Sequence, residues 1–133
     1  MRIALVSPYS WTYPGGVTRH IEALAAQFRA EGHEVRVLSP YDAADRLSAR
    51  LHGGATPEAR EMPDWLVPLG RTVGIGANGA VSNLALTPYA VTTLRRELRA
   101  MRPDVVHVHE PVAPAVGYDA LDTVVAPLVG TFH

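Results

Sequence analysis

The chain has 133 residues, 47% hydrophobic and 19% charged, which is the composition of a single globular domain rather than of a disordered segment. Its 12 basic and 13 acidic residues nearly cancel, so no overall field favours nucleic acid or an anionic membrane. The lack of cysteine excludes a disulfide framework and a thiolate metal site, and it favours a cytoplasmic location.

The start of the chain predicts a strand, a helix and a second strand. Residues 3–6 form an apolar run that is typical of a buried parallel strand and too short for a signal peptide or a membrane span. Apolar residues between positions 17 and 28 recur at helical spacing, and Gly32 is expected to end that helix. Residues 35–38 predict a second strand, which completes a βαβ unit.

The middle of the chain carries weaker patterns. Residues 41–62 are polar and mixed in charge, and we expect a long surface loop there, with a short helical turn at residues 45–51. Residues 65–68 predict a third strand. Asn78-Gly79 lies between two short apolar segments, where it indicates either a hairpin turn or a simple loop.

The last third of the chain returns to alternating helices and strands. Helices are predicted at residues 88–101 and 113–121, and strands at residues 104–109 and 127–132. Gly117 weakens the second of these helices, because glycine is a poor helix former. Strands that alternate with helices predict the α/β class, with a Rossmann-like, doubly wound and mostly parallel sheet. We expect one Rossmann-like domain over residues 1–133.

The end of the chain also bears on its organisation. Residue 133 follows a predicted strand, at the edge of the sheet where open α/β folds bind their ligands. A domain rarely stops there. We therefore expect the sequence to be truncated, with a further carboxyl-terminal domain absent from it.

The first candidate site lies between the first strand and the first helix. Gly15 and Gly16 allow the backbone to come close to a ligand, and the helix that follows offers unpaired N–H groups that suit phosphate. Neither the Rossmann glycine fingerprint nor a P-loop is present, so a tight turn that needs positive φ is the alternative. Tyr9, Trp11 and Tyr13 in this loop either stack on a sugar-like ligand or simply pack the loop.

The other candidates follow later strands. His107 and His109 lie on the same face of their strand, and Glu110 comes next. Two histidines and a carboxylate resemble a metal site, but no third protein ligand is apparent nearby, so we expect no metal. The alternative for His107 is a buried histidine bonded to the backbone, whereas His109 and Glu110 are better placed for a polar site. His133 can donate a hydrogen bond or transfer a proton.

Several motifs, in this order and spacing, resemble those of glycosyltransferase family 4. They are the opening Met-Arg-Ile-Ala-Leu-Val-Ser-Pro-Tyr-Ser, Pro-Gly-Gly-Val at residues 14–17, Gly-His-Glu-Val at residues 32–35, the run at residues 103–111 that ends in His-Val-His-Glu-Pro, and the closing Thr-Phe-His. The similarity covers essentially the whole chain, is weakest at residues 42–62, and is closest to the phosphatidylinositol mannosyltransferases. Each motif alone is weak, but the set is specific.

The resemblance implies the amino-terminal, acceptor-side half of a GT-B fold, whose other half would bind the sugar nucleotide. It implies a retaining glycosyltransferase that transfers a sugar such as mannose to a lipid or small-molecule acceptor. By position, Gly15 and Gly16 would bind the donor diphosphate, and Tyr9 would line the acceptor pocket. His133 would be the catalytic residue beside the transferred sugar. His109 and Glu110 would fall near the same cleft. The implied partners are the nucleotide sugar and its acceptor, with no metal and no cofactor.

One departure from the resemblance concerns the membrane. The mannosyltransferases carry a basic cluster on and before the helix that corresponds to residues 88–101, whereas residues 81–86 here contain no basic residue. Each lost basic residue weakens attachment to an anionic membrane by about 1 kcal/mol. We therefore expect a cytoplasmic protein, at most peripheral at the inner membrane face, with a lipid or a different, soluble acceptor.

Other interpretations of the sequence predict different functions. A stand-alone, non-catalytic module that binds phosphate or a nucleotide is the alternative to a transferase. A nucleotide-cofactor oxidoreductase is disfavoured, because the glycine fingerprint is missing and no acidic residue ends the second strand at residues 38–40. If the chain is a transferase fragment, we expect it to be inactive alone and able to dimerise through exposed cleft surface.

Overall fold

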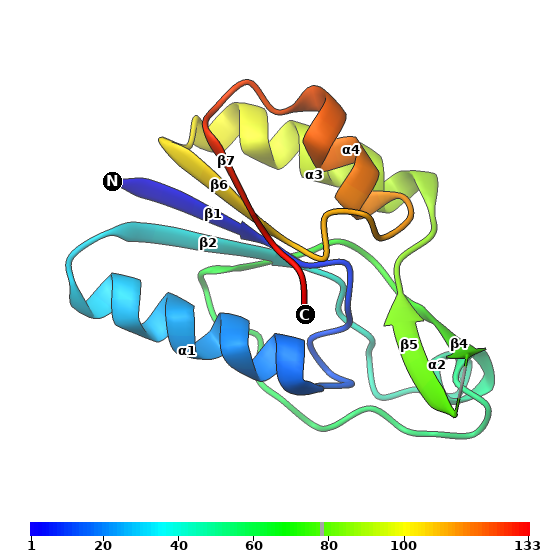
Figure 1. Ribbon diagram of the computed structural model, residues 1–133. Coiled ribbons are helices and arrows are strands. Elements are labelled where there is room, and N and C mark those ends of the chain that lie inside the picture. The colour runs from blue at the N-terminus through cyan, green and yellow to red at the C-terminus, as the bar shows by residue number, and fades with distance from the viewer. Residues whose placement is uncertain (78) are drawn as a thin grey trace.

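The computed structural model of the chain describes residues 1–77 and 79–133 (Figure 1). Its centre is a five-stranded parallel sheet in the order β3-β2-β1-β6-β7. The strands are β1 (Arg2–Val6), β2 (Glu34–Ser39), β3 (Leu66–Pro68), β6 (Val105–His109) and β7 (Leu128–Thr131). The helices are α1 (Gly16–Ala30), α2 (Arg46–Leu51), α3 (Pro88–Met101) and α4 (Val116–Thr123). The predicted α/β class and mostly parallel sheet are confirmed.

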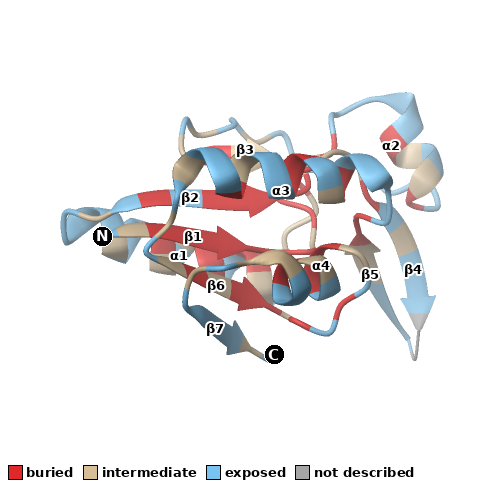
Figure 2. Cartoon of the chain, turned by 90° about the horizontal axis from the view of Figure 1, so that it is seen from above, coloured by how far each residue is buried: buried red, intermediate tan, exposed pale blue. Residues whose placement is uncertain are grey.

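Helices cover both faces of this sheet. α1 lies on one face, and α3 and α4 lie on the other (Figure 1). In β1, Ile3 and Leu5 belong to the core cluster on the α1 side, whereas Ala4 and Val6 belong to the cluster on the α3 and α4 side. Because both faces of β1 are buried, its sequence is a continuous apolar run. Figure 2 shows the buried strands in the middle of the sheet and the exposed β7 at its edge.

The order of the strands determines where a ligand can bind. From β1 the chain crosses through α1 to β2 and then β3 on one side, and it returns through α3 to β6 and β7 on the other. The direction of winding therefore reverses between β1 and β6, which are parallel neighbours. In open α/β sheets such a reversal opens a crevice outside the carboxyl ends of the two strands.

The helix boundaries agree with the predicted ones, with one shift. α1 ends before Gly32, whose φ is 89°. α3 starts at Pro88, after a cap in which the Thr87 hydroxyl accepts the N–H of Ala90. α4 starts at Val116 rather than at residue 113, since Ala115 has a φ of 63°, outside the helical range.

Gly117 is explained by close packing. A Cβ at this position would lie 2.8 Å from the carbonyl oxygen of Pro111 and 2.9 Å from that of Glu110. Real Cβ atoms do not approach backbone so closely. The residue that weakens α4 by propensity is therefore the one that lets α4 pack against the loop after β6.

The expected surface loop at residues 41–62 is wrong in one respect. α2 confirms the helical turn, but Asp42, at the start of the segment, is only 1% exposed. Its carboxylate accepts hydrogen bonds from Ser10 Oγ at 2.6 Å and from the N–H and Oγ1 of Thr72 at 2.9 and 2.7 Å. This network ties the loop after β1 to the segment before β4, because a buried carboxylate needs such partners.

A second, two-stranded sheet lies beside the large one. Its strands, β4 (Val73–Ala77) and β5 (Ala80–Leu84), pair antiparallel, so the chain forms a hairpin there and not a simple loop. Asn78, which was part of that prediction, lies outside the described residues. A bridge between Tyr9 and Leu84 joins the hairpin to the loop after β1. In the part of the chain that the structure describes, no helix is long and apolar enough to cross a membrane.

Candidate functional site

The residues predicted to form a site gather at the carboxyl edge of the large sheet. They lie after β1 (Tyr9), at the start of α1 (Gly15 and Gly16), at the end of β6 (His109 and Glu110) and after β7 (His133). In Figure 1 the carboxyl terminus, marked C, lies close to the start of α1. The strand order predicts a ligand-binding crevice at this same edge.

The glycine pair is not required by a turn. Gly15 caps α1 with a φ of −115°, and neither Gly15 nor Gly16 has a positive φ. A Cβ added to either glycine would meet nothing within 4 Å. The tight-turn interpretation is therefore wrong, since alanine would fit both positions in the free protein. What the glycines keep clear is the space in front of the helix.

That space is electrostatically open to an anion. No side chain in residues 1–77 or 79–133 caps the amino terminus of α1, and the first turn of this helix contains no acidic residue. The first N–H groups of a helix carry a partial positive charge, which favours phosphate or another anion in front of them. The local chemistry therefore suits a phosphate group placed against Gly15 and Gly16.

A small pocket of about 180 Å³ opens beside this helix terminus. Tyr9, Tyr13 and the two glycines line it, together with residues 81–83 of β5. Burial raises the pKa of Tyr9, and the negative charge of Glu110 raises it further. Tyr9 is thus a neutral hydroxyl at physiological pH, able to donate a hydrogen bond into the site.

The three aromatic residues of the first loop have different roles. Trp11 is 1% exposed, and its ring meets that of Trp65 edge-on at 5.7 Å, so it belongs to the core. Tyr13 donates its hydroxyl to the carbonyl of Ala55 at 2.7 Å and stacks on His52. Ordinary packing therefore explains Trp11, whereas Tyr9 and Tyr13 border the pocket.

Four histidines, from α1, from β6 and from the segment after β7, form a cluster at the same edge. The ring of His109 stacks on His107 at 4.2 Å and on His133 at 5.3 Å between centroids. His109 Nδ1 lies 3.0 Å from His133 Nε2, within hydrogen-bond distance. His20 of α1 approaches His133 and His109 edge-on, at 5.4 and 5.7 Å.

Among the described residues, the ring of His107 has no hydrogen bond to the backbone, which was the alternative for it. Its Nε2 lies 2.7 Å from Thr131 Oγ1 on the neighbouring strand β7, and its ring is only partly buried. His109 is 0% exposed, so it has no contact with solvent, and its Nδ1 contacts His133 instead. His133 itself is exposed.

Glu110 joins the two strand ends. Its backbone N–H donates to the carbonyl of Thr131 at 2.8 Å, and its carboxylate accepts the backbone N–H of His133. Its φ of 51° lies in the left-handed region, which is unusual for a residue other than glycine. Glu110 therefore anchors the backbone at His133, in addition to facing Tyr9.

Burial keeps the centre of the histidine cluster neutral. It lowers the pKa of His109 to about 3, and the nearby charges of His107, His133 and His20 act in the same direction. Burial, followed by the charges of His20 and His133, also lowers the pKa of His107.

Within residues 1–77 and 79–133 no group of three or more acidic or histidine side chains has an arrangement that could hold a metal ion.

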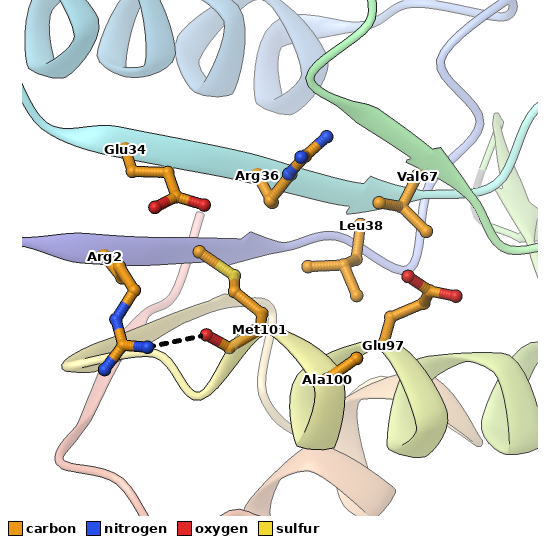
Figure 3. Close-up of a pocket in the computed structure, with 8 residues that line it drawn as sticks. All are labelled: Arg2, Glu34, Arg36, Leu38, Val67, Glu97, Ala100 and Met101. Carbon is orange, nitrogen blue, oxygen red and sulfur yellow. Dashed lines mark hydrogen bonds between the residues drawn. The ribbon is translucent and has the colours of Figure 1, made fainter.

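A larger hollow, of about 390 Å³, lies beside the carboxyl end of α3 on the opposite face from α1 (Figure 3). Its charged lining is balanced, with Arg2 and Arg36 against Glu34 and Glu97. Arg2 also donates to the carbonyl of Met101 at 3.2 Å. None of the predicted site residues lines this hollow, and it is not part of the candidate site.

Comparison with known proteins agrees with this geometry. The sequence pattern of Glycosyltransferase Family 4 matches residues 14–133. The chain belongs to glycosyltransferase family 4. The expected resemblance and the Rossmann-like α/β architecture of a GT-B fragment are thereby confirmed.

Three curated relatives of this family 4 chain carry the same name. The phosphatidyl-myo-inositol mannosyltransferases of Mycobacterium leprae and Mycolicibacterium smegmatis are each 38% identical to it, and that of Propionibacterium freudenreichii is 34% identical. Each match covers 100% of this chain, but only 32%, 31% and 33% of the respective relative. The family 4 chain thus spans about a third of the length of these curated relatives.

Sequence reasoning missed one participant in the site, His20, and one buried residue that supports the loop after β1, Asp42. His20 has a helical signal that could have revealed it, because it lies four residues after Gly16 and so on the same face of α1. Asp42 had no such signal, since its partners come from distant segments of the chain.

Proposed function

We propose that this family 4 chain is the acceptor-side part of a retaining glycosyltransferase, which transfers a hexose such as mannose from a nucleotide sugar to a hydroxyl acceptor. The main support for the proposal is the arrangement at the amino terminus of α1. The glycine pair keeps space clear before the uncapped amino terminus of α1, and His20 of that helix lies beside His133. This arrangement offers an anion site next to a hydrogen-bonding side chain.

The proposed reaction needs no side-chain nucleophile. When the glycosidic bond to the donor breaks, negative charge grows on the leaving diphosphate, and the N–H groups of α1 stabilise that charge. A methyl group at Gly15 or Gly16 would occupy the space that the phosphate oxygens need. Transfer with retention then proceeds by same-face attack, in which the leaving phosphate takes the acceptor proton. His133 binds the transferred sugar.

The acceptor pocket favours a ring-shaped hydroxyl compound. Tyr9 and Tyr13 present aromatic surface and a neutral phenol, which suit a sugar or cyclitol, either free or as a lipid headgroup. On α3, Arg95 pairs with Asp119 and Arg96 pairs with Glu97. These pairs reduce the positive charge available for an anionic membrane, so we propose transfer that does not depend on electrostatic membrane binding.

A chimera tests the proposal. Residues 1–133 replace the matching third of the M. smegmatis mannosyltransferase, and the remainder of that enzyme is left unchanged. We expect the purified chimera to transfer mannose from the nucleotide-mannose donor that the unmodified M. smegmatis enzyme uses in the same assay. Free myo-inositol and vesicles that contain phosphatidylinositol serve as separate acceptors, which distinguishes a soluble acceptor from a lipid headgroup.

The controls are the unmodified relative and the isolated chain. We expect residues 1–133 alone to be folded but inactive with every donor, because most donor contacts would come from the other domain. A folded chimera that binds the nucleotide sugar yet transfers to neither acceptor, beside an active relative, would contradict the proposal. Tight binding of phosphate by the isolated chain in that case would favour the non-catalytic module.

A further inference from the structure

The ring of His133 is held by one buried side chain. His133 Nε2 lies 3.0 Å from Nδ1 of His109, and the two rings stack with an angle of 24° between their planes. His109 is 0% exposed, whereas His133 is exposed. One ring nitrogen of His133 is therefore occupied inside the protein, and Nδ1 is the nitrogen left for a ligand.

The direction of this hydrogen bond follows from burial. His109 Nε2 is buried and has no hydrogen-bond partner among the described residues. A buried N–H without an acceptor is rare in proteins, because it forfeits a hydrogen bond that water would have made. The single proton of a neutral His109 therefore belongs on Nδ1, from which it is donated to His133 Nε2. Burial supports the neutral state, since it lowers the pKa of His109 to about 3.

We propose that His109 is a positioning residue, which fixes the ring and the tautomer of His133 so that Nδ1–H of His133 is the donor offered to a ligand oxygen. The other titratable groups that face the pair are His20 from α1, His107 from β6 and Glu110 after β6. That the ligand oxygen belongs to a transferred sugar rests on the proposed function. The hydrogen bond between the histidines does not rest on it.

The tautomers can be observed directly in the chain of 133 residues. Protonated and unprotonated ring nitrogens resonate in well separated ¹⁵N ranges, so long-range ¹H–¹⁵N NMR spectra assign the proton in each ring. At neutral pH we expect Nδ1 to be protonated and Nε2 unprotonated in both His109 and His133. Averaged nitrogen shifts for His133, or protons on Nε2 in both rings, would overturn the proposal.

Two substitutions separate the hydrogen bond from the ring that makes it. His109→Asn places an amide N–H near the position of Nδ1–H, whereas His109→Phe keeps an aromatic ring without a donor. We expect His133 to keep its single tautomer in the first variant and to show averaged nitrogen shifts in the second. His107→Phe is the matched control, because His107 belongs to the cluster but bonds to Thr131, and it should leave the tautomer of His133 unchanged.

The same variants have a kinetic readout in the chimera. We expect His109→Phe to lower kcat by about 100-fold with little change in KM for the donor, since a misplaced catalytic group loses rate rather than binding. His109→Asn should recover kcat to within about tenfold of the unsubstituted chimera. Equal losses in both variants would overturn the positioning role. An inactive chimera with the expected NMR tautomers would count against the proposed function alone.

Discussion

At the residue scale, burial sets the pKa values of the two histidines of β6. His107 and His109 lie two residues apart on one strand face, yet only His109 is fully enclosed. Enclosure disfavours the charged form and so lowers the pKa of both, to about 3 for His109. A neutral His109 has a single ring N–H, which the proposed hydrogen bond to His133 uses.

This pKa predicts how stability depends on pH. As the pH falls below the ordinary histidine value of 6.5, the unfolded chain takes up a proton at His109, but the folded chain does not until about pH 3. The free energy of unfolding therefore decreases as the pH drops from 6.5 toward 3, and this contribution is constant above 6.5. For one proton the slope approaches about 1.4 kcal/mol per pH unit.

Urea unfolding at pH values from 7.5 to 4.5 measures this slope, in a window above the ordinary carboxylate values. His109→Asn, which cannot titrate, should flatten the profile relative to the unsubstituted chain. Parallel profiles for the unsubstituted chain and His109→Asn would show that His109 does not titrate as its burial implies.

Single residues also mark the limit of prediction from sequence. Gly15, Gly16 and His133 were found because they follow predicted strands, where α/β folds place their sites. Asp42 was not, since its burial depends on hydrogen bonds to Ser10 and Thr72, which lie 32 and 30 positions away in the chain. The roles assigned to the site residues came from family resemblance and stay predictions.

At the element scale, the local apolar pattern determines which segments are helical, whereas tertiary contacts determine where a helix such as α4 begins. The apolar periodicity of α1 and α3 was sufficient to predict both helices, because each packs one face on the sheet. The start of α4 was misplaced, because the φ of Ala115 and the packing against Pro111 override propensity there. The hairpin of β4 and β5 was ambiguous, since short segments carry little periodicity.

Gly117→Ala tests the packing of α4. Helix propensity alone would make alanine more stable than glycine by about 1 kcal/mol. The methyl group would, however, lie 2.8 Å from backbone at Pro111, so we expect net destabilisation of about 1–3 kcal/mol. Gly76→Ala is the matched control, because a Cβ there meets nothing within 4 Å. Equal or greater stability of Gly117→Ala in urea unfolding would disprove the close contact.

At the scale of the whole molecule, the strand order brings the site together. The sequence predicted alternating strands and helices, but the order β3-β2-β1-β6-β7 is set by pairing between distant segments. That order places the carboxyl ends of β1, β6 and β7 side by side, and with them the glycine pair and the histidine cluster. The edge strand β7 stays exposed, with Val129 46% accessible, and so does Phe132 after it, at 67%.

We propose that Gly15 and Gly16 keep space clear for the donor diphosphate. The most direct measurement is kcat/KM for the nucleotide sugar in the chimera, with Gly16→Ala compared with Gly76→Ala, since both add a methyl group that meets nothing within 4 Å. We predict a loss of about 100-fold for Gly16→Ala, with a melting temperature no lower than that of the unsubstituted chimera, and no loss for Gly76→Ala. Activity of Gly16→Ala equal to that of the unsubstituted chimera would contradict the account.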